Sequence, residues 1–353
     1  MNADKEYFLK LQSSIYPQND NSEYFLNEWQ RVTNNLFPEN VTFTSSDFCK
    51  TFDISMEQFE NLTGPTFKDL VNQKNLVDPF LESLDEESYD KLKTVIIGTL
   101  PKRSIDAETF TGPFGTPLIV FHDGLNWLID HFKWIQTYRE EQSFSQASRM
   151  YYVSELQKLQ LFFLKDGKLD ITLSRIQLSE ESFFKYTIQV QFLKVFIFAH
   201  EYAHIYLNHL KEVDEIQVDL GQNGKPTDFK NYTINQSMEF EADELAYRWY
   251  KAFLQSDTDL VKAANEYSKH LLILPLELLY LFNLLQTPMI LFKENSTAKT
   301  HPPIIERFIK LYDIMKKDLT PEEISRVEEM LIEAKKQINI SLKAKSLIEK
   351  KHL

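Results

Sequence analysis

The segment FIFAHEYAHIYLNHL, residues 196–210, is the feature that most constrains the fold and chemistry of this chain. It holds three of the eight histidines, His200, His204 and His209, among apolar residues. Apolar flanks on both sides favour a buried helix. Because a buried polar side chain costs free energy unless it finds a partner, the segment predicts a partner for its histidines, such as a metal ion.

His200 and His204 lie four residues apart, so a helix places both imidazoles on one face. Glu201 lies between them and completes the H-E-x-x-H pattern of zinc peptidases. Zinc accepts imidazole ligands, and three protein ligands leave a fourth position for water. We therefore interpret the two histidines as ligands and Glu201 as the general base. The alternative is a helix with two buried histidines and no metal, which the apolar flanks disfavour.

A third ligand is expected from SMEFEADELA, residues 237–246. Glu239 and Asp243 are again four residues apart, so a second helix can present both on one face. We expect Glu239 to reach the metal and Asp243 to accept a hydrogen bond from the other nitrogen of a ligand histidine. Glu241 points to another side. His209 is the competing third ligand, and a solvated acidic face is the competing interpretation of the acids.

Three motifs occur in a fixed order, HEYAHIYLNH, EFEADELA and THPPIIERF. In this order they resemble the zinc metallopeptidase (gluzincin) family of the CAAX prenyl protease and the bacterial heat-shock membrane protease. Members of that family show H-E-x-x-H with a histidine five residues on, then E-(F/Y)-x-A-D-x-x-A, then H-P-P with an arginine six residues after that histidine. The segment GTPLIVFHDGL, residues 115–125, is similar to the family's glycine-containing strand and helix start. The resemblance covers roughly residues 110–135 and 187–310.

The resemblance implies an α+β, mainly α fold: a zincin-type core with a small sheet that carries an edge strand, plus helical N- and C-terminal regions. It implies zinc bound by His200, His204 and Glu239, with Glu201 as base and Asp243 supporting a ligand. Residues 117–121, with Leu118, Ile119 and Val120, would be the edge strand that pairs with an extended substrate. Pro117 suits an edge because proline cannot donate to a ladder. His301 and Arg307 would lie near the site, and His301 is our candidate donor to the tetrahedral oxyanion.

The chain is also similar to the phage-exclusion protease Lit group, cytosolic H-E-x-x-H enzymes that cleave a host translation factor. This second resemblance rests on the central motif, the size range and the absence of a convincing membrane span. The apolar run at 271–292 contains Glu277, Asn283 and two prolines, so we expect a buried core helix there.

The formal net charge of −13 argues against a nucleic-acid-binding surface, which needs basic residues to neutralise phosphates. Cys49 is the single cysteine, so one chain can form neither a disulfide framework nor a cysteine-based zinc site. The N-terminus has no apolar signal-like segment. These features lead us to expect a cytoplasmic protein.

The organisation expected along the chain has three parts. Residues 1–90 form a helical region without recognisable chemistry, residues 91–310 form the peptidase core with an insertion at about 139–186, and residues 311–353 form C-terminal helices. Within the core we expect a strand at 94–100, a turn, strand and helix at 112–138, and a long helix from about 187 to 210. We expect His122 and His131 to be structural.

The sequence thus predicts a soluble, cytoplasmic endopeptidase with one zinc ion per chain and a protein or peptide substrate. No nucleic-acid partner and no membrane association are expected, and the oligomeric state is not predicted. The regions 1–90 and 139–186 are expected to gate the site or select a partner. Two alternatives remain open: a Lit-like protease acting on a host protein in phage defence, and a non-catalytic zinc-stabilised interaction protein. Against the last, Glu201 contributes nothing to a structural site, and such sites are usually closed by cysteine or histidine.

Overall fold

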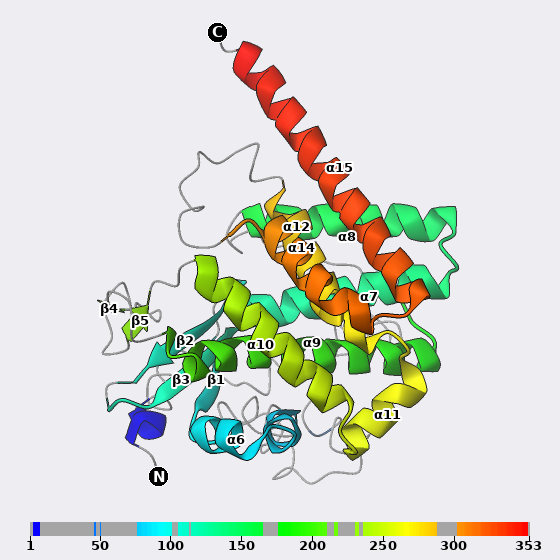
Figure 1. The fold of residues 1–353 in the computed structure, drawn as a ribbon. Helices are drawn as coiled ribbons and strands as arrows, with labels where there is room; N and C mark the ends of the chain where they lie inside the picture. The colour runs from blue at the N-terminus through cyan, green and yellow to red at the C-terminus, as the bar shows by residue number, and fades with distance from the viewer. Residues whose placement is uncertain are drawn as a thin grey trace.

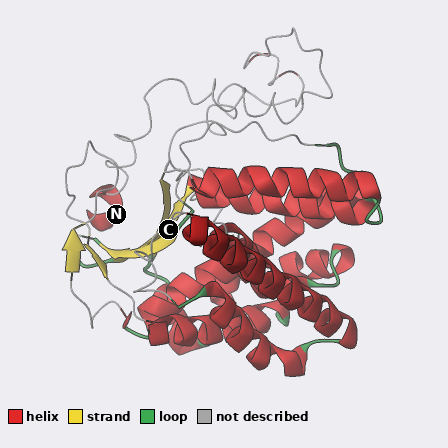
Figure 2. Cartoon of the chain, turned by 90° about the horizontal axis from the view of Figure 1, so that it is seen from above, coloured by secondary structure: helices red, strands yellow, loops and turns green. Residues whose placement is uncertain are grey.

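The computed structural model describes residues 3–7, 46, 50, 76–100, 105–112, 114–164, 176–209, 215–217, 230–232, 236–287 and 302–351. The described part is mainly helical with one small sheet, which confirms the predicted α+β, mainly α class. Seen from above, the strands gather on one side of the helical body (Figure 2). His301 and most of residues 1–75 lie outside the described residues.

The sheet has five described strands in the order β1-β3-β2-β5-β4. The strands are β1 (Ile96–Leu100), β2 (Ala107–Thr111), β3 (Pro117–His122), β4 (Glu215–Gln217) and β5 (Lys230–Tyr232). β3 runs parallel to β1 and antiparallel to β2, whereas β5 meets β2 at the single pair Thr111 and Lys230. The predicted strand at 94–100 is therefore confirmed as β1, and β2 is a strand that the sequence patterns did not indicate.

The structure corrects the prediction that residues 117–121 form an edge strand. β3 has a neighbour on each side, and Leu118, Ile119 and Val120 are at most 1% exposed. The reason is the position of Pro117, which is the first residue of the strand. A proline there removes no donor from the interior of the ladder, so it is compatible with a central strand. The main chain of β3 is already paired and cannot bind a substrate strand.

The helices pack around α9 (Glu180–Tyr206), which contacts the sheet at β2 and β3 and lies against several other helices. α9 begins seven residues before the predicted start at 187, because Ser179 caps it by accepting a hydrogen bond from Ser182 N. The other helices are α6 (Glu86–Leu92), α7 (Asp123–Glu141), α8 (Gln146–Leu164), α10 (Gln236–Leu254), α11 (Asp259–Tyr267), η2 (Leu271–Ile273), α12 (Leu274–Gln286), α14 (Ile304–Met315), η3 (Lys316–Asp318) and α15 (Pro321–Lys351). Figure 1 shows α10 crossing α9 beside the sheet, and α15 extending away from the body.

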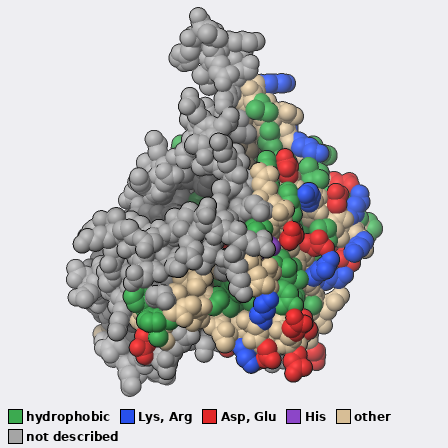
Figure 3. All heavy atoms as spheres, turned by 60° about the vertical axis from the view of Figure 1, so that its left-hand side comes forward, with side chains coloured by type: hydrophobic (Ala, Val, Ile, Leu, Met, Phe, Trp, Pro, Cys, Tyr) green, Lys and Arg blue, Asp and Glu red, His purple; other side chains and the backbone are tan. Residues whose placement is uncertain are grey.

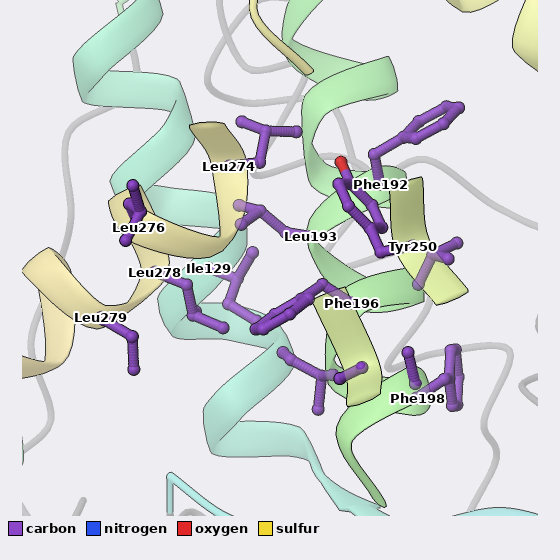
Figure 4. Packing of buried hydrophobic residues seen from close by; sticks show 14 of the residues in the cluster. Ile129, Phe192, Leu193, Phe196, Phe198, Tyr250, Leu274, Leu276, Leu278 and Leu279 are labelled. Atoms are coloured by element: carbon purple, nitrogen blue, oxygen red, sulfur yellow. The ribbon is translucent and has the colours of Figure 1, made fainter. Parts of the chain in front are cut away.

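The core lies between α7, α9, α10 and α12. Phe196 points from α9 toward Ile129 of α7 and Leu278 of α12 (Figure 4). On the other side of α9, the buried Tyr250 donates its hydroxyl to Leu271 O at 2.8 Å. α12 is buried almost throughout, which confirms the core helix expected within 271–292. No described helix is long and apolar enough to cross a membrane.

Five charged side chains form an ion cluster around the buried Lys133 and Glu277, where α7, α9, α12 and α15 meet. Lys133 Nζ lies 2.7 Å from Glu277 Oε2, and Arg326 Nη2 lies 2.8 Å from Glu277 Oε1. Arg326 Nη2 also lies 2.6 Å from Glu140 Oε1, while Lys185 Nζ lies 2.7 Å from Glu140 Oε2. All four carboxylate oxygens therefore have a cationic partner, which ties the C-terminal helix to the body.

α15 starts with side-chain hydrogen bonds that cap its first turn. Thr320 N donates to Glu323 Oε2 at 2.9 Å, and Glu323 N donates to Thr320 Oγ1 at 3.3 Å, a reciprocal capping box. Pro321 takes the first helical position, where its missing N–H costs nothing. On the described surface, basic and acidic side chains are interspersed without a broad basic patch in the view of Figure 3.

Candidate metal centre

The last turns of α9 carry the two histidines of the H-E-x-x-H motif. His200 Nε2 and His204 Nε2 lie 3.1 Å apart, so the same nitrogen of each ring faces a common point. His204 is almost fully buried, and His200 is 12% exposed at its side chain. The helix thus brings the two imidazoles to one side, as spacing by four residues requires.

α10 brings Glu239 to the same point. Glu239 Oε2 lies 3.6 Å from His200 Nε2, and Oε1 lies 4.0 Å from His204 Nε2. His200, His204 and Glu239 have ligand atoms within 4.8 Å of one another and could hold a metal ion. A tetrahedral metal with ligands at about 2.0–2.1 Å needs ligand atoms separated by roughly 3.3 Å. The observed separations bracket this value, and the two-histidine, one-carboxylate set suits zinc.

Asp243 and Arg307 support these three residues from behind. His200 Nδ1 lies 3.0 Å from Asp243 Oδ1, so Asp243 can fix the ring with Nε2 toward the common point. Arg307, on α14, donates through Nε and Nη2 to the two oxygens of Asp243 at 2.8 and 2.7 Å. Its Nη1 lies 2.7 Å from Glu239 Oε2. Arg307 therefore clamps both acids in place.

His209 does not join the ligand set in this structure. α9 ends at Tyr206 rather than near residue 210, and Asn208 takes a left-handed conformation with φ of 59°. The turn folds His209 back, so that its Nδ1 lies 2.9 Å from His204 Nδ1, on the side of that ring away from the common point. Glu241 Oε2 lies 3.5 Å from His209 Nε2 and its side chain is 60% exposed. Glu241 thus faces away from the common point. His209 contacts the predicted ligand His204 and does not itself reach that point.

Glu201 is held beside the histidines by a residue from the sheet. Thr109 Oγ1 of β2 lies 2.6 Å from Glu201 Oε2, and both side chains are buried. Burial raises the pKa of Glu201 to about 7, against the lowering effects of the His200 charge and the Thr109 hydrogen bond. A carboxylate with this pKa can take up and release a proton near neutral pH.

The groups around the two histidines shift their pKa values in opposite directions. Burial opposes a charge on His200, but hydrogen bonds with Asp243 and Glu239 raise its pKa to about 10. Burial and the neighbouring His200 charge hold the pKa of His204 well below its usual range. Because a histidine ligand must be neutral, metal binding at this centre would be coupled to loss of a proton from His200.

A second group of possible ligands lies on β2, β3 and the loop before β2. Asp106, Glu108 and His122 have ligand atoms within 4.8 Å of one another, but Asp106 is exposed and Glu108 is partly exposed. Exposed acidic groups often lie together without a metal, so we assign no site there. His131 lies 3.3 Å from the buried Glu155, and this contact ties α7 to α8.

Sequence reasoning did not single out Thr109. Its strand is five residues long and becomes a neighbour of α9 only through pairing of β2 with β3. The segment AETFT has two polar residues, Glu108 and Thr109, between Ala107 and Phe110, so it lacks the strict alternation typical of a half-buried strand and does not show which helix lies opposite.

Comparison with known families bears on the part of the chain that contains these helices. The model of the family Peptidase U49, the Lit-like proteases, matches residues 188–328. No curated protein and no solved structure matches the chain. The matched segment includes His200, Glu239, Asp243 and Arg307 but leaves out β1, β2 and β3. The family match agrees with the resemblance to the Lit group, and it gives no support to the resemblance to the CAAX prenyl protease family. The similarity supports a protease that acts on protein.

Proposed function

We propose that this chain is a zinc-dependent endopeptidase in which His200, His204 and Glu239 hold one zinc ion and Glu201 is the general base. The observation that carries the proposal is the convergence of three ligand atoms beside Glu201, from helices that the Peptidase U49 match also covers. A non-catalytic zinc site would have no use for a buried carboxylate held next to the ligands.

When bound, zinc would polarise the scissile carbonyl and lower the pKa of a water molecule toward about 7. Glu201 would accept a proton from the attacking water and return it to the nitrogen of the leaving amine. Asp243 would keep His200 oriented through Nδ1, and Arg307 would keep Glu239 and Asp243 ionised and in place. The two supporting residues, Asp243 and Arg307, act by position and charge.

We propose that an extended substrate lies along β2 rather than β3. β2 pairs with β3 along its length, but on its other side β5 meets it at one described pair, Thr111 and Lys230. β2 also carries Thr109, which contacts Glu201. A peptide that adds to this side by main-chain hydrogen bonds would pass the general base.

The proposal is tested with the purified full-length chain and a proteome-derived peptide library read by mass spectrometry. Wild type with zinc should cleave peptides, and a chelator should stop cleavage. Glu201→Gln should retain zinc and melting temperature while cleavage falls by about 10²- to 10⁴-fold. Zinc-loaded wild type that cleaves neither the peptide library nor any protein in a lysate, or Glu201→Gln with the wild-type rate, would overturn it.

The family match favours a narrower form of this function, a protease that acts on one particular cellular protein as the Lit group does. In that case the full-length chain should digest casein poorly but cleave one protein in a lysate at a defined bond. Rapid casein digestion, unchanged by removal of residues 1–75, would contradict selectivity and leave zinc-dependent hydrolysis intact.

A further inference from the structure

Thr109 makes the one contact between the sheet and the H-E-x-x-H glutamate that the described residues show. It lies in the middle of β2, opposite Ile119 of β3, and is 3% exposed. Its Oγ1 reaches Glu201 Oε2 at 2.6 Å, a contact between residues 92 positions apart in sequence. A hydrogen bond this short to a buried carboxylate is of the strong, charge-assisted kind.

We infer that Thr109 is a positioning residue for Glu201, holding Oε2 so that Oε1 is the oxygen that receives the proton. The inference rests on the proposed function and adds a residue outside the segment that the family model matches. Because Oε2 is engaged by a hydroxyl from a rigid strand, the carboxylate cannot turn freely about its last torsion. The orientation of the base is then set before substrate arrives.

The path of the proton is consistent with Thr109 donating to Oε2 while Oε1 receives the proton. As water attacks the carbonyl carbon, its O–H bond breaks and a new O–H bond forms at Oε1. Thr109 keeps donating to Oε2 in both the ionised and the protonated state of Glu201, since a carboxylic acid retains an acceptor oxygen. When the proton leaves Oε1 for the amine nitrogen, the carboxylate returns to its starting orientation.

The residue type also fits the role. A β-branched residue suits the strand, and its hydroxyl is the only group on the side chain that can donate. Valine has nearly the same shape without the donor, and serine keeps the donor with less bulk. The two substitutions therefore separate the hydrogen bond from the packing of β2 against α9.

The test compares Thr109→Val and Thr109→Ser with Thr137→Val as a matched control. Thr137 is buried on α7, and its hydroxyl has no hydrogen-bond partner among the described residues. Each variant is measured for zinc content, melting temperature, and kcat and KM on a peptide that wild type cleaves. Crystal structures of the two Thr109 variants show the orientation of the Glu201 carboxylate.

We expect Thr109→Val to keep zinc and KM while kcat falls by about 10- to 100-fold, with the carboxylate displaced or in several orientations. Thr109→Ser should keep kcat within about threefold, and Thr137→Val should match wild type. Wild-type kcat in Thr109→Val, or equal losses in Thr109→Val and Thr109→Ser, would overturn the inference. If Glu201→Gln is inactive while Thr109→Val is fully active, only this inference fails; if Glu201→Gln is active, the proposed function fails.

Discussion

Two clusters of charged side chains lie in the same helical body, and they are built differently. In the ion cluster, each oxygen of Glu140 and Glu277 has a lysine or arginine nitrogen at 2.6–2.8 Å. In the candidate metal centre, the Nδ1 atoms of His200 and His204 are engaged by Asp243 and His209, while their Nε2 atoms face each other at 3.1 Å.

The difference separates a cluster in which every carboxylate oxygen is paired with a cation from one in which three possible ligand atoms converge. Fully paired charges need nothing further, and their removal should cost stability alone. Donor atoms that converge from two rings and one carboxylate repel or compete for a proton unless a cation lies between them. We therefore expect variants of the ion cluster to change unfolding, and variants of the metal centre to change zinc affinity and catalysis.

The largest effect is expected from Glu277→Gln in the ion cluster. It leaves Lys133 fully buried without its carboxylate partner, which typically costs about 3–5 kcal/mol. Urea unfolding followed by circular dichroism measures the loss, and zinc content should not change. Glu244→Gln is the control, since its pair with Arg248 is exposed and worth about 0–1 kcal/mol. A loss of unfolding free energy below about 1 kcal/mol for Glu277→Gln would contradict the claim that the buried Lys133 depends on this carboxylate.

Acid should weaken the same cluster through Glu140. Burial alone would raise the pKa of this carboxyl, but the charges of Arg326, Lys133 and Lys185 lower it to about 2. Because the folded pKa lies below the unfolded value of 4.5, the stabilisation is present above about pH 5 and is lost as the pH falls toward 2. The free energy of unfolding should decrease over this window, and Glu140→Gln should flatten the decrease. An equally steep decrease in Glu140→Gln would assign the acid sensitivity to other groups.

A smaller effect is expected from Asp243→Ala in the metal centre. Loss of the contact to His200 Nδ1 should reduce zinc affinity by about 10- to 100-fold, as measured by competition with a chelator. Asp313→Ala, an exposed acid on α14, should leave affinity unchanged. Unchanged affinity in Asp243→Ala would mean that His200 does not depend on Asp243 for its orientation.

The smallest effect is expected from Glu241→Ala. Its carboxylate is exposed and lies 3.5 Å from His209, so its loss should change zinc affinity by less than about fivefold. Glu239→Ala, two residues away, should remove most of the zinc. If Glu241→Ala proved the more damaging of the two, the ligand on α10 would be misassigned.

Much of the centre follows from sequence because helical periodicity is local. The spacing of His200 and His204, and of Glu239 and Asp243, places each pair on one face whatever the rest of the chain does. The turn, strand and helix at 112–138 and the buried helix after residue 271 were predicted for the same local reasons.

The remaining features depend on contacts between distant segments. The place of β3 inside the sheet depends on β1 and β2, and Pro117 at the strand start does not reveal them. The end of α9 at Tyr206 depends on a left-handed Asn208, a conformation that sequence periodicity does not indicate. Thr109 becomes a partner of Glu201 only after β2 has paired and packed on α9.

Anomalous X-ray diffraction at the zinc edge, on crystals of the full-length zinc-containing protein, tests the central claim most directly. The account predicts one peak, about 2.0–2.2 Å from His200 Nε2, His204 Nε2 and an oxygen of Glu239. A peak at Asp106, Glu108 and His122 instead, or no peak between the two histidines, would contradict it.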